Sequence, residues 1–374
     1  MTETYTVRRY SPELKNQVID LQAHLWSPRP ELNRAYFEWK YERNPYLADP
    51  LIFVAMHEDT VVGMRGFFGV QWEAGVPVQR FTSLYADDMV VAPEHRRHGL
   101  TTRIMSWALA DLASRGYDYV FNLSAGTVTL HSSLKMGWRT AGGMRPMLWH
   151  STRSRLLRRL ARMAESLPVF YGFVKPLATI GGNDFAPGNR KIVAYGLSIQ
   201  ETPRCHEMAQ LLSRIDTANQ GHIRHVRDAE YLKWRFANPL SRYHFIYSDN
   251  RQLDGYLVLH EYASEMANHE VVNVVDWEAA DPAVLERLLR GAIAIASRRP
   301  IVIWSATLSQ DAIALLLRHG FRAEASSKPN VLSPPQLLIR KLRRDLVGGH
   351  WTLAGLPLLD IANWDLRMLY SMVG

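Results

Sequence analysis

Residues 90–104 combine side chains and spacing that could bind an anion. An apolar run stops at Pro93, a basic segment containing Arg96 and Gly99 follows, and apolar residues at helical spacing begin at Leu100. The start of a helix presents unpaired backbone N–H groups and the positive end of the helix dipole, and a glycine lets a phosphate approach the backbone closely. The segment therefore predicts a strand, an anion-binding turn and a helix, with an ordinary strand-to-helix turn as the alternative.

Two adjacent carboxylates, Asp87 and Asp88, lie on the strand predicted before this turn. Because alternate side chains of a strand face opposite sides, we expect one of the two to face a substrate bound beside the strand. A carboxylate in that place could accept a proton. The alternative is that both aspartates satisfy loop amides or pair with arginines.

Two motifs in this region resemble the signatures of the GNAT acetyltransferase superfamily. Arg96-x-x-Gly99-Leu100-Thr101 is similar to its acetyl-coenzyme A signature, except that Thr101 replaces the usual small residue. Residues 128–138, which end in Gly-Trp, resemble its second signature, a helix ending in Gly-aromatic. The two motifs have the expected order and separation, and the resemblance covers about residues 80–140.

This resemblance implies an α/β (α+β) fold and an acyl-CoA-dependent acyltransferase. In the family the acceptor nitrogen attacks the thioester directly, so no metal is expected. The residues that the resemblance assigns to acetyl-CoA are Val90, Val91, Arg96, Arg97, His98, Gly99, Leu100, Thr101 and Thr102.

The resemblance also implies catalytic residues. A base often lies on the strand before the turn in this family, and we choose Asp88 over Asp87. The tyrosine commonly found four residues before the glycine of the second signature is replaced by Ser133, so Tyr85, His131 or a water would protonate the leaving thiolate.

Composition and charge limit the partners. The chain has 374 residues, enough for two domains, and 47% of them are hydrophobic. Much of its net charge of +8 comes from residues 151–190, with seven Arg or Lys against two Asp or Glu, and residues 328–344, with five against none. Since nucleic-acid-binding domains more often show a basic face with interleaved aromatics, we expect CoA phosphates or, weakly, an anionic membrane surface as partners, and no nucleic acid.

Other sequence features point to a cytoplasmic protein without a metal. Cys205 is the only cysteine, so no intramolecular disulfide forms, and neither a signal peptide nor a membrane-spanning apolar run is found in the sequence. Cys205 lies in no recognisable nucleophile motif. For His222 and His225 we expect surface or turn roles, because no carboxylate or thiol set accompanies them.

The second half of the chain repeats the first. Residues 231–239 and 36–45 both contain Tyr-x-x-Trp, a basic residue, an aromatic residue and Asn-Pro. Gly255 matches Gly63 in a predicted hairpin, and residues 317–322 match residues 134–139 type by type. Three matches in one order predict a duplicated fold, with two tandem mixed sheets flanked by helices.

The copies differ at the predicted anion-binding turn. In the second copy Asp281 precedes Pro282 at the expected helix start, and no Arg-x-x-Gly is present. An N-cap aspartate would repel pyrophosphate, so we predict a degenerate second unit. The expected domains are a catalytic unit at 1–150, a basic linker at 151–190, the degenerate unit at 191–345 and a tail at 346–374 that packs on a domain.

The resulting prediction is transfer of an acetyl or related acyl group from CoA to an amine, with an amino sugar or polysaccharide precursor as the suggested acceptor. One alternative is an aminoacyl-tRNA-dependent, Fem-like peptidoglycan transferase, which shares the tandem fold but typically lacks the Arg-x-x-Gly-x-Gly turn. The other is a non-catalytic CoA-binding or scaffold protein.

Overall fold

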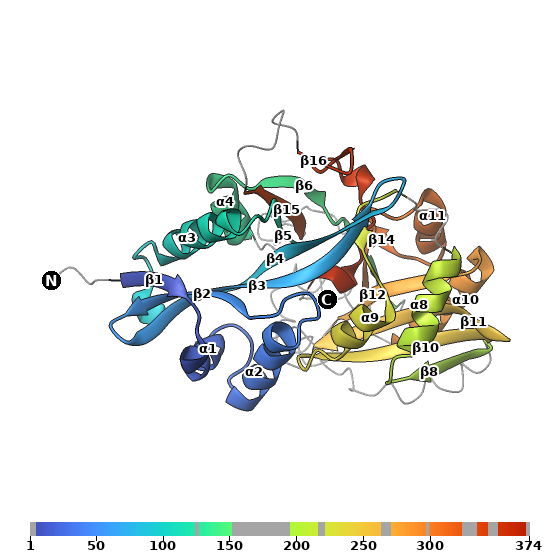
Figure 1. Ribbon diagram of the computed structural model, residues 1–374. Coiled ribbons are helices and arrows are strands. Elements are labelled where there is room, and N and C mark those ends of the chain that lie inside the picture. Colours follow the sequence, from blue (N-terminus) through green and yellow to red (C-terminus); the bar gives the residue numbers. More distant parts are fainter. Residues whose placement is uncertain are drawn as a thin grey trace, which may run out of the picture.

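The computed structural model describes residues 5–123, 127–151, 195–215, 221–262, 271–296, 299–323, 335–342 and 351–371 (Figure 1). All but one residue of the predicted basic linker lie outside these ranges. The helices and strands of the first half are β1 (Tyr5–Arg9), α1 (Lys15–Gln22), α2 (Pro30–Phe37), β2 (Leu51–His57), β3 (Thr60–Ala74), β4 (Gln79–Val91), α3 (Leu100–Ser114), β5 (Tyr119–Asn122), α4 (Thr127–Lys135), β6 (Arg139–Gly143) and β7 (Pro146–Trp149).

The second half follows a similar order. Its elements are β8 (Leu197–Gln200), α8 (Cys205–Ile215), β9 (Arg224–His225), α9 (Ala229–Phe236), β10 (Ser241–Asn250), β11 (Gln252–Tyr262), β12 (Val272–Ala279), α10 (Pro282–Ala296), β13 (Ile301–Trp304), α11 (Gln310–Arg318), β14 (Arg322–Ala323) and β15 (Gln336–Lys341), followed by β16 (Thr352–Leu353) and β17 (Leu356–Pro357).

The predicted helix after the turn is confirmed, because α3 begins at Leu100 and ends at Ser114. Its apolar residues at helical spacing, Leu100, Ile104, Ala108 and Leu112, are buried together with residues of the first sheet. Burial of this one face of the helix explains why the spacing was readable in the sequence.

Each sheet contains strands from the other half of the chain, which the sequence did not predict; the two-residue β9, for example, pairs with β3 of the first sheet. Strand β7 directly follows β6 of the first unit in the chain, but it lies between β13 and β14 of the second sheet. In return β15 lies between β5 and β6, so the first sheet has the order β1-β2-β3-β4-β5-β15-β6 (Figure 1). Neither 1–150 nor 191–345 therefore contains every strand of its own sheet.

The predicted duplication is confirmed at the contact between the two copies. The indole rings of Trp39 and Trp234 stack at 5.1 Å between centroids and 13° between planes. Trp39 Nε1 donates to the carbonyl of Trp234 at 2.6 Å, and Trp234 Nε1 donates to the carbonyl of Trp39 at 2.9 Å. This reciprocal pair relates the two copies by a local two-fold arrangement.

The matched glycines identify which helices are equivalent. A Cβ atom on Gly63 would lie 3.0 Å from Ile104 Cδ1 of α3, and one on Gly255 would lie 2.5 Å from Val284 Cγ1 of α10. In each copy the glycine thus lets the helix pack closely on the hairpin. It follows that α3 and α10 occupy corresponding places.

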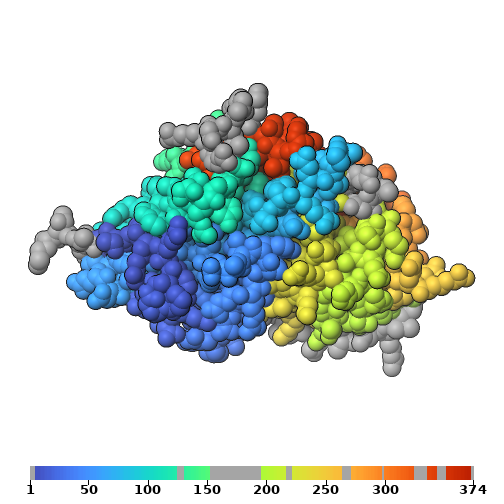
Figure 2. Space-filling view, in the orientation of Figure 1, coloured from blue at the N-terminus to red at the C-terminus, as the bar shows by residue number. Residues whose placement is uncertain are grey.

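A large aromatic core joins the two units and the C-terminal segment. It includes Trp72 from β3, Phe121 from β5 and Trp364, whose ring lies 5.6 Å from that of Phe121. In Figure 2 the C-terminal segment (red) lies against the N-terminal half (light blue to teal). Among the described residues, no helix has the length and apolar content needed to span a bilayer.

Candidate active site

The turn before α3 is open and exposed. Gly99 is the N-cap of α3 with φ 71°, and Arg97 also has a left-handed backbone with φ 69°. No side chain caps the helix, and a Cβ atom on Gly99 would meet no atom within 4 Å. The first N–H groups of α3 lack partners within the helix, so they remain available to an anion.

Two arginines brace this turn against neighbouring strands. Arg96 Nε donates to the carbonyl of Val91 at 3.1 Å, and Arg103 Nη2 donates to the carbonyl of Tyr5 at 2.7 Å. Arg97, His98 and Thr102 are exposed, whereas Val90, Val91 and Leu100 are buried beside them. The structure thus brings the predicted coenzyme-binding residues together around the end of β4 and the start of α3.

The expectation that Asp87 and Asp88 face opposite sides is wrong. Lys40 Nζ lies 2.7 Å from Asp87 Oδ2 and 2.8 Å from Asp88 Oδ1. The reason is a β-bulge: Met64 pairs with Val90 and Gly66 pairs with Asp87, so two residues of β4 stand opposite one residue of β3. Asp88, with φ 51°, is one of the two bulge residues, and strict alternation stops there.

Asp88 has the contacts of a structural carboxylate. Its side chain is fully buried and accepts hydrogen bonds from Lys40 at 2.8 Å, Tyr41 at 2.5 Å, Gln22 at 3.3 Å and Trp26 at 3.1 Å. Burial raises the pKa of Asp88, while Lys40 and Tyr41 oppose that rise. With both oxygens engaged, Asp88 offers little room to an acceptor amine.

Asp87 is the more accessible of the two aspartates. Its side chain is 16% exposed, whereas the Lys40 side chain that pairs with it is completely buried. Lys40 also donates to Tyr36 at 3.0 Å, so its position is fixed by three oxygens. The geometry favours Asp87 over Asp88 as the base, and the choice stays a prediction.

The sequence reading missed Lys40, although the repeat contained a signal for it. Its counterpart in the second copy is Arg235, which is also buried and donates to the carbonyls of Leu369 at 2.8 Å and Ser371 at 2.7 Å. A basic side chain is therefore buried at the equivalent position of both copies. In the second unit the C-terminal segment supplies these two acceptors, and the hydroxyl of Tyr243 on β10 accepts a third hydrogen bond from Arg235 at 2.6 Å.

Arg65 was also missed. It stands on β3 opposite the bulge, is 4% exposed, and forms no hydrogen bond or ion pair with the described part of the chain. Burial lowers the pKa of Arg65, and the charge of Asp87 opposes this. A buried cation without a bonded partner is unfavourable, so Arg65 is a second candidate for contact with a bound group.

The remaining predicted residues are dispersed. Tyr85 is buried against Phe68 at 5.3 Å between ring centroids, and its hydroxyl has no partner among the described residues. Ser133 lies in α4, where its carbonyl accepts the N–H groups of Met136 and Trp138 at the helix end. His131 is exposed on α4.

Two side chains to which the sequence analysis assigned no chemical role, Cys205 and His225, are partly or fully buried. Burial raises the pKa of the half-buried Cys205 thiol, which disfavours a nucleophilic role. The expected surface or turn role of His225 is wrong: its ring is 2% exposed and stacks on Tyr370 at 3.9 Å. A two-residue strand, β9, carries it into the core beside Trp72.

Residues 17–136, which hold the turn, both aspartates and Lys40, match the model of the acetyltransferase (GNAT) family. The chain contains a GNAT domain. The sequence matches no curated protein.

Solved structures extend this fold to both halves of the chain. A tandem GNAT protein from the clavulanic acid biosynthesis pathway is 14% identical with a TM-score of 0.52, and the alignment covers 91% of this chain and 99% of that one. A probable N-acyltransferase from Enterococcus faecalis is 11% identical (TM-score 0.53, 91% and 73% covered). A GCN5-related N-acetyltransferase from Kribbella flavida is 15% identical (TM-score 0.52, 91% and 72% covered). These similarities show a shared fold.

The second unit differs from the GNAT domain at the start of its helix. Asp281 Oδ1 accepts the N–H groups of Ala283 at 2.8 Å and Val284 at 2.9 Å, as an N-cap should. The place that α3 leaves open to an anion is therefore taken in α10 by a carboxylate of the protein. No group of three or more potential metal-binding side chains occurs among the described residues.

Proposed function

We propose that the GNAT domain binds acetyl-CoA or a related acyl-CoA and transfers the acyl group to an amine. The observation that supports this most directly is the uncapped, exposed start of α3, where Gly99 leaves open space beside free N–H groups. Pyrophosphate would lie on the backbone N–H groups of residues 97–102. In the second unit the carboxylate of Asp281 disfavours the same ligand.

The proposed reaction forms a C–N bond and breaks the C–S bond of the thioester. The amine nitrogen attacks the carbonyl carbon, and Asp87 accepts the ammonium proton directly or through one water. The leaving thiolate takes a proton from Tyr85, whose pKa burial raises, or from water. Fixing the two substrates beside each other supplies the orientation that the reaction needs.

An amino sugar or polysaccharide precursor remains our suggestion for the acceptor. The Fem-like alternative is disfavoured because Arg96 and Gly99 keep the coenzyme-type turn. A non-catalytic CoA-binding protein would bind acetyl-CoA without releasing CoA when an amine is present. Thiol release, followed across a panel of amines, separates that alternative from an enzyme.

The test of this proposal is calorimetric titration of the full chain with acetyl-CoA. Gly99→Glu places a side chain and a negative charge where the pyrophosphate approaches, so we expect at least about tenfold weaker binding. Gly116→Glu is the matched control: Gly116 directly follows the C-cap of the same helix, has φ 86°, and also has open space around its Cβ position. Equal affinities of the two variants and the wild type would contradict the proposed turn.

A further inference from the structure

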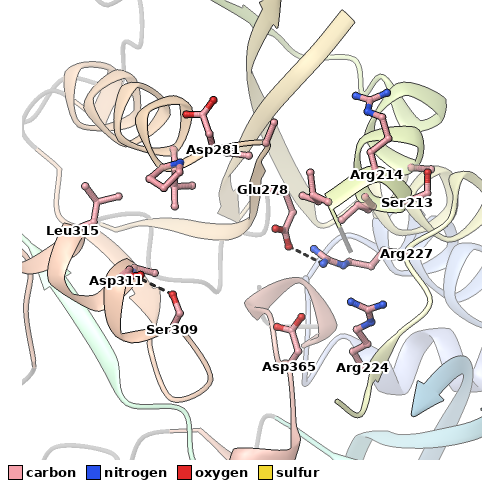
Figure 3. A pocket seen from close by; sticks show the side chains of 18 of the residues that line it. Ser213, Arg214, Arg224, Arg227, Glu278, Asp281, Ser309, Asp311, Leu315 and Asp365 are labelled. Atoms are coloured by element: carbon pink, nitrogen blue, oxygen red, sulfur yellow. Dashed lines mark hydrogen bonds and ion pairs between the residues drawn. The ribbon is translucent and has the colours of Figure 1, made fainter. Parts of the chain in front are cut away.

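The cavity at the start of α10 shows what the second unit does not share with the GNAT domain. It measures about 1050 Å³, corresponds to the open turn by the equivalence of α3 and α10, and is lined by residues of both units and of the C-terminal segment, among them His225. Figure 3 shows Arg227 directed at Glu278, to which it donates at 2.7 Å, and Asp281 at the helix start. Because these charges are paired or acidic, the cavity disfavours a second acyl-CoA. The contacts between the units are therefore the place where the second unit can affect the reaction.

The two units meet beside a buried cation of each. Trp39 and Trp234 stack at 5.1 Å between ring centroids, and each indole donates to the backbone carbonyl of the other residue. Lys40 directly follows Trp39 in the chain. Arg235 follows Trp234, and its guanidinium lies 6.0 Å from the centre of the Trp39 ring. The contact between the two tryptophans therefore holds together the segments that carry both cations.

Four aromatic rings enclose the ammonium group of Lys40. Its Nζ lies between 5.0 and 5.7 Å from the ring centres of Tyr36, Phe68, Tyr41 and Trp26, which we call the ring cage. The side chain of Lys40 is completely buried, and ring faces attract a cation most strongly where water is excluded. The position of the ammonium therefore depends on the positions of these rings.

Trp234 of the second unit packs against this ring cage. Its ring lies 6.2 Å from that of Phe68. The ring of Trp39, on which Trp234 stacks, lies 5.4 Å from that of Tyr36. Since protein interiors are closely packed, removal of the buried Trp234 indole would leave a void into which the cage rings can shift.

Lys40 in turn fixes one oxygen of Asp87 and leaves the other free. Its ammonium donates to Asp87 Oδ2 at 2.7 Å, to Asp88 Oδ1 at 2.8 Å and to the Tyr36 hydroxyl at 3.0 Å, so each of its three hydrogens has an acceptor. Asp87 Oδ1 has no hydrogen bond or ion pair to the part of the chain that the structure describes. A carboxylate held by one oxygen presents the other in a fixed direction, as a proton acceptor requires.

We propose that Lys40 and Trp234 are positioning residues of the acyl transfer, through which the second unit takes part in the reaction. Trp234 holds the ring cage, the cage holds the ammonium of Lys40, and Lys40 holds Asp87 so that Oδ1 accepts the proton of the attacking amine. Asp87 is the base in the proposed function, on which this step rests. The second unit thus contributes to catalysis without binding a ligand of its own.

Trp234→Leu in the full chain tests this assignment. Thiol release from acetyl-CoA is measured with glucosamine, spermidine or ethanolamine, whichever reacts fastest with the wild type. We expect kcat to fall about tenfold, because the base is misplaced, with unchanged acetyl-CoA affinity by calorimetry. Trp277→Leu is the matched control and should leave kcat unchanged: Trp277 is also a buried tryptophan of the second unit, but it packs in the core beneath α10.

A second set of variants separates positioning from a general structural effect. In Asp87→Asn the base is already absent, so adding Trp234→Leu should lower kcat/KM no further, whereas loss of stability alone would lower it equally in both backgrounds. Lys40→Arg keeps the charge but not the geometry of the ammonium, and it should lower kcat at unchanged acetyl-CoA affinity. If Trp234→Leu does not fold, Trp234→Phe, which keeps a ring against Trp39, should show a smaller fall in kcat with the same dependence on Asp87.

A crystal structure of the folded Trp234 variant gives a readout that does not need turnover. We expect Lys40 Nζ to lie beyond hydrogen-bond distance of Asp87 Oδ2 in that structure. Lys40 in its wild-type place, equal kcat in the variant and the wild type, or the same fold-change in both backgrounds would overturn the positioning role. If the wild type released no thiol with any of the three amines but Lys40 moved as expected, the link from Trp234 to Asp87 would be supported and the proposed function contradicted.

Discussion

Asp87 and Asp88 share one ammonium group and differ in everything else they contact. Asp88 is enclosed by four donors, while Asp87 keeps part of its carboxylate exposed. The bulge in β4 is the cause of this difference, since it turns Asp88 toward Lys40 and Tyr41. Two adjacent residues of the same type can thus serve separately in chemistry and in stability.

Replacing each aspartate by asparagine tests this division. We expect Asp87→Asn to lower kcat/KM by about 10²–10⁴ with little change in acetyl-CoA affinity, because it removes the proton acceptor. Asp88→Asn should instead lower the free energy of unfolding by about 1–3 kcal/mol, because buried donors lose a charged acceptor. Steady-state kinetics and urea unfolding measure the two effects. Near-normal turnover in Asp87→Asn across pH 6 to 9 would remove it from the mechanism.

At the scale of elements, the starts of α3 and α10 show how one fold can carry opposite electrostatics. Gly99 leaves the N–H groups of α3 free, whereas Asp281 binds those of α10. The elements around the two helix starts correspond, and Gly63 and Gly255 let α3 and α10 pack equally closely on the neighbouring hairpins. A single N-cap residue therefore separates a place suited to phosphate from one that disfavours it.

The exchanged strand β15 makes the first sheet depend on residues far along the chain. Leu338 is completely buried on β15, where it pairs with Asn122 of β5 and Thr140 of β6. We expect Leu338→Ala to lower the free energy of unfolding by about 2–5 kcal/mol through lost burial and a cavity. Leu317→Ala, at a leucine 44% exposed on α11, is the control and should change it by less than about 0.5 kcal/mol.

Urea unfolding, followed through acetyl-CoA binding as well as tryptophan fluorescence, checks this prediction. Since β15 completes the sheet that carries β4, loss of acetyl-CoA binding should coincide with unfolding. If Leu338→Ala were no less stable than Leu317→Ala, the exchange of strands would not occur in solution.

At the scale of the whole molecule, burial of neutral histidines in the shared core makes stability depend on pH. Burial and Arg235 lower the pKa of His260 to about 3, and burial with Arg227 and Arg235 lowers that of His225. In the unfolded chain the two imidazole rings bind a proton below about pH 6.5, whereas in the folded chain they remain neutral until far lower pH. The stability that depends on keeping these two histidines neutral is therefore fully present above about pH 6.5. It is lost as the pH falls from about 6.5 toward the pKa values of the folded state.

Urea unfolding at about pH 7 and about pH 5.5 should show this loss, at about 1.4 kcal/mol per pH unit for each histidine below 6.5. His260→Gln should make the dependence shallower, whereas His206→Gln, at an exposed position on α8, should not. A wild-type stability that is equal at both values, or higher at the lower pH, would contradict the assignment.

The sequence alone determined the features that rest on local patterns. Helical spacing from Leu100, the glycine at the turn and the aspartate before Pro282 each act through their immediate neighbours, and all three were readable. The duplication was readable too, because Tyr-x-x-Trp and Asn-Pro recur in both copies. The open turn before α3 could therefore be predicted from the sequence without the fold.

Only the tertiary structure decided what depends on distant contacts. Alternation predicted opposite faces for Asp87 and Asp88, but a bulge set by pairing with β3 placed both on Lys40, which is 47 residues from Asp87. The partners of β7 and β15 could not be predicted, because a strand of four to six residues pairs through backbone groups that every sequence has. The cavity beside His225 likewise arises where both units and the C-terminal segment meet, and no single stretch of sequence specifies such a meeting.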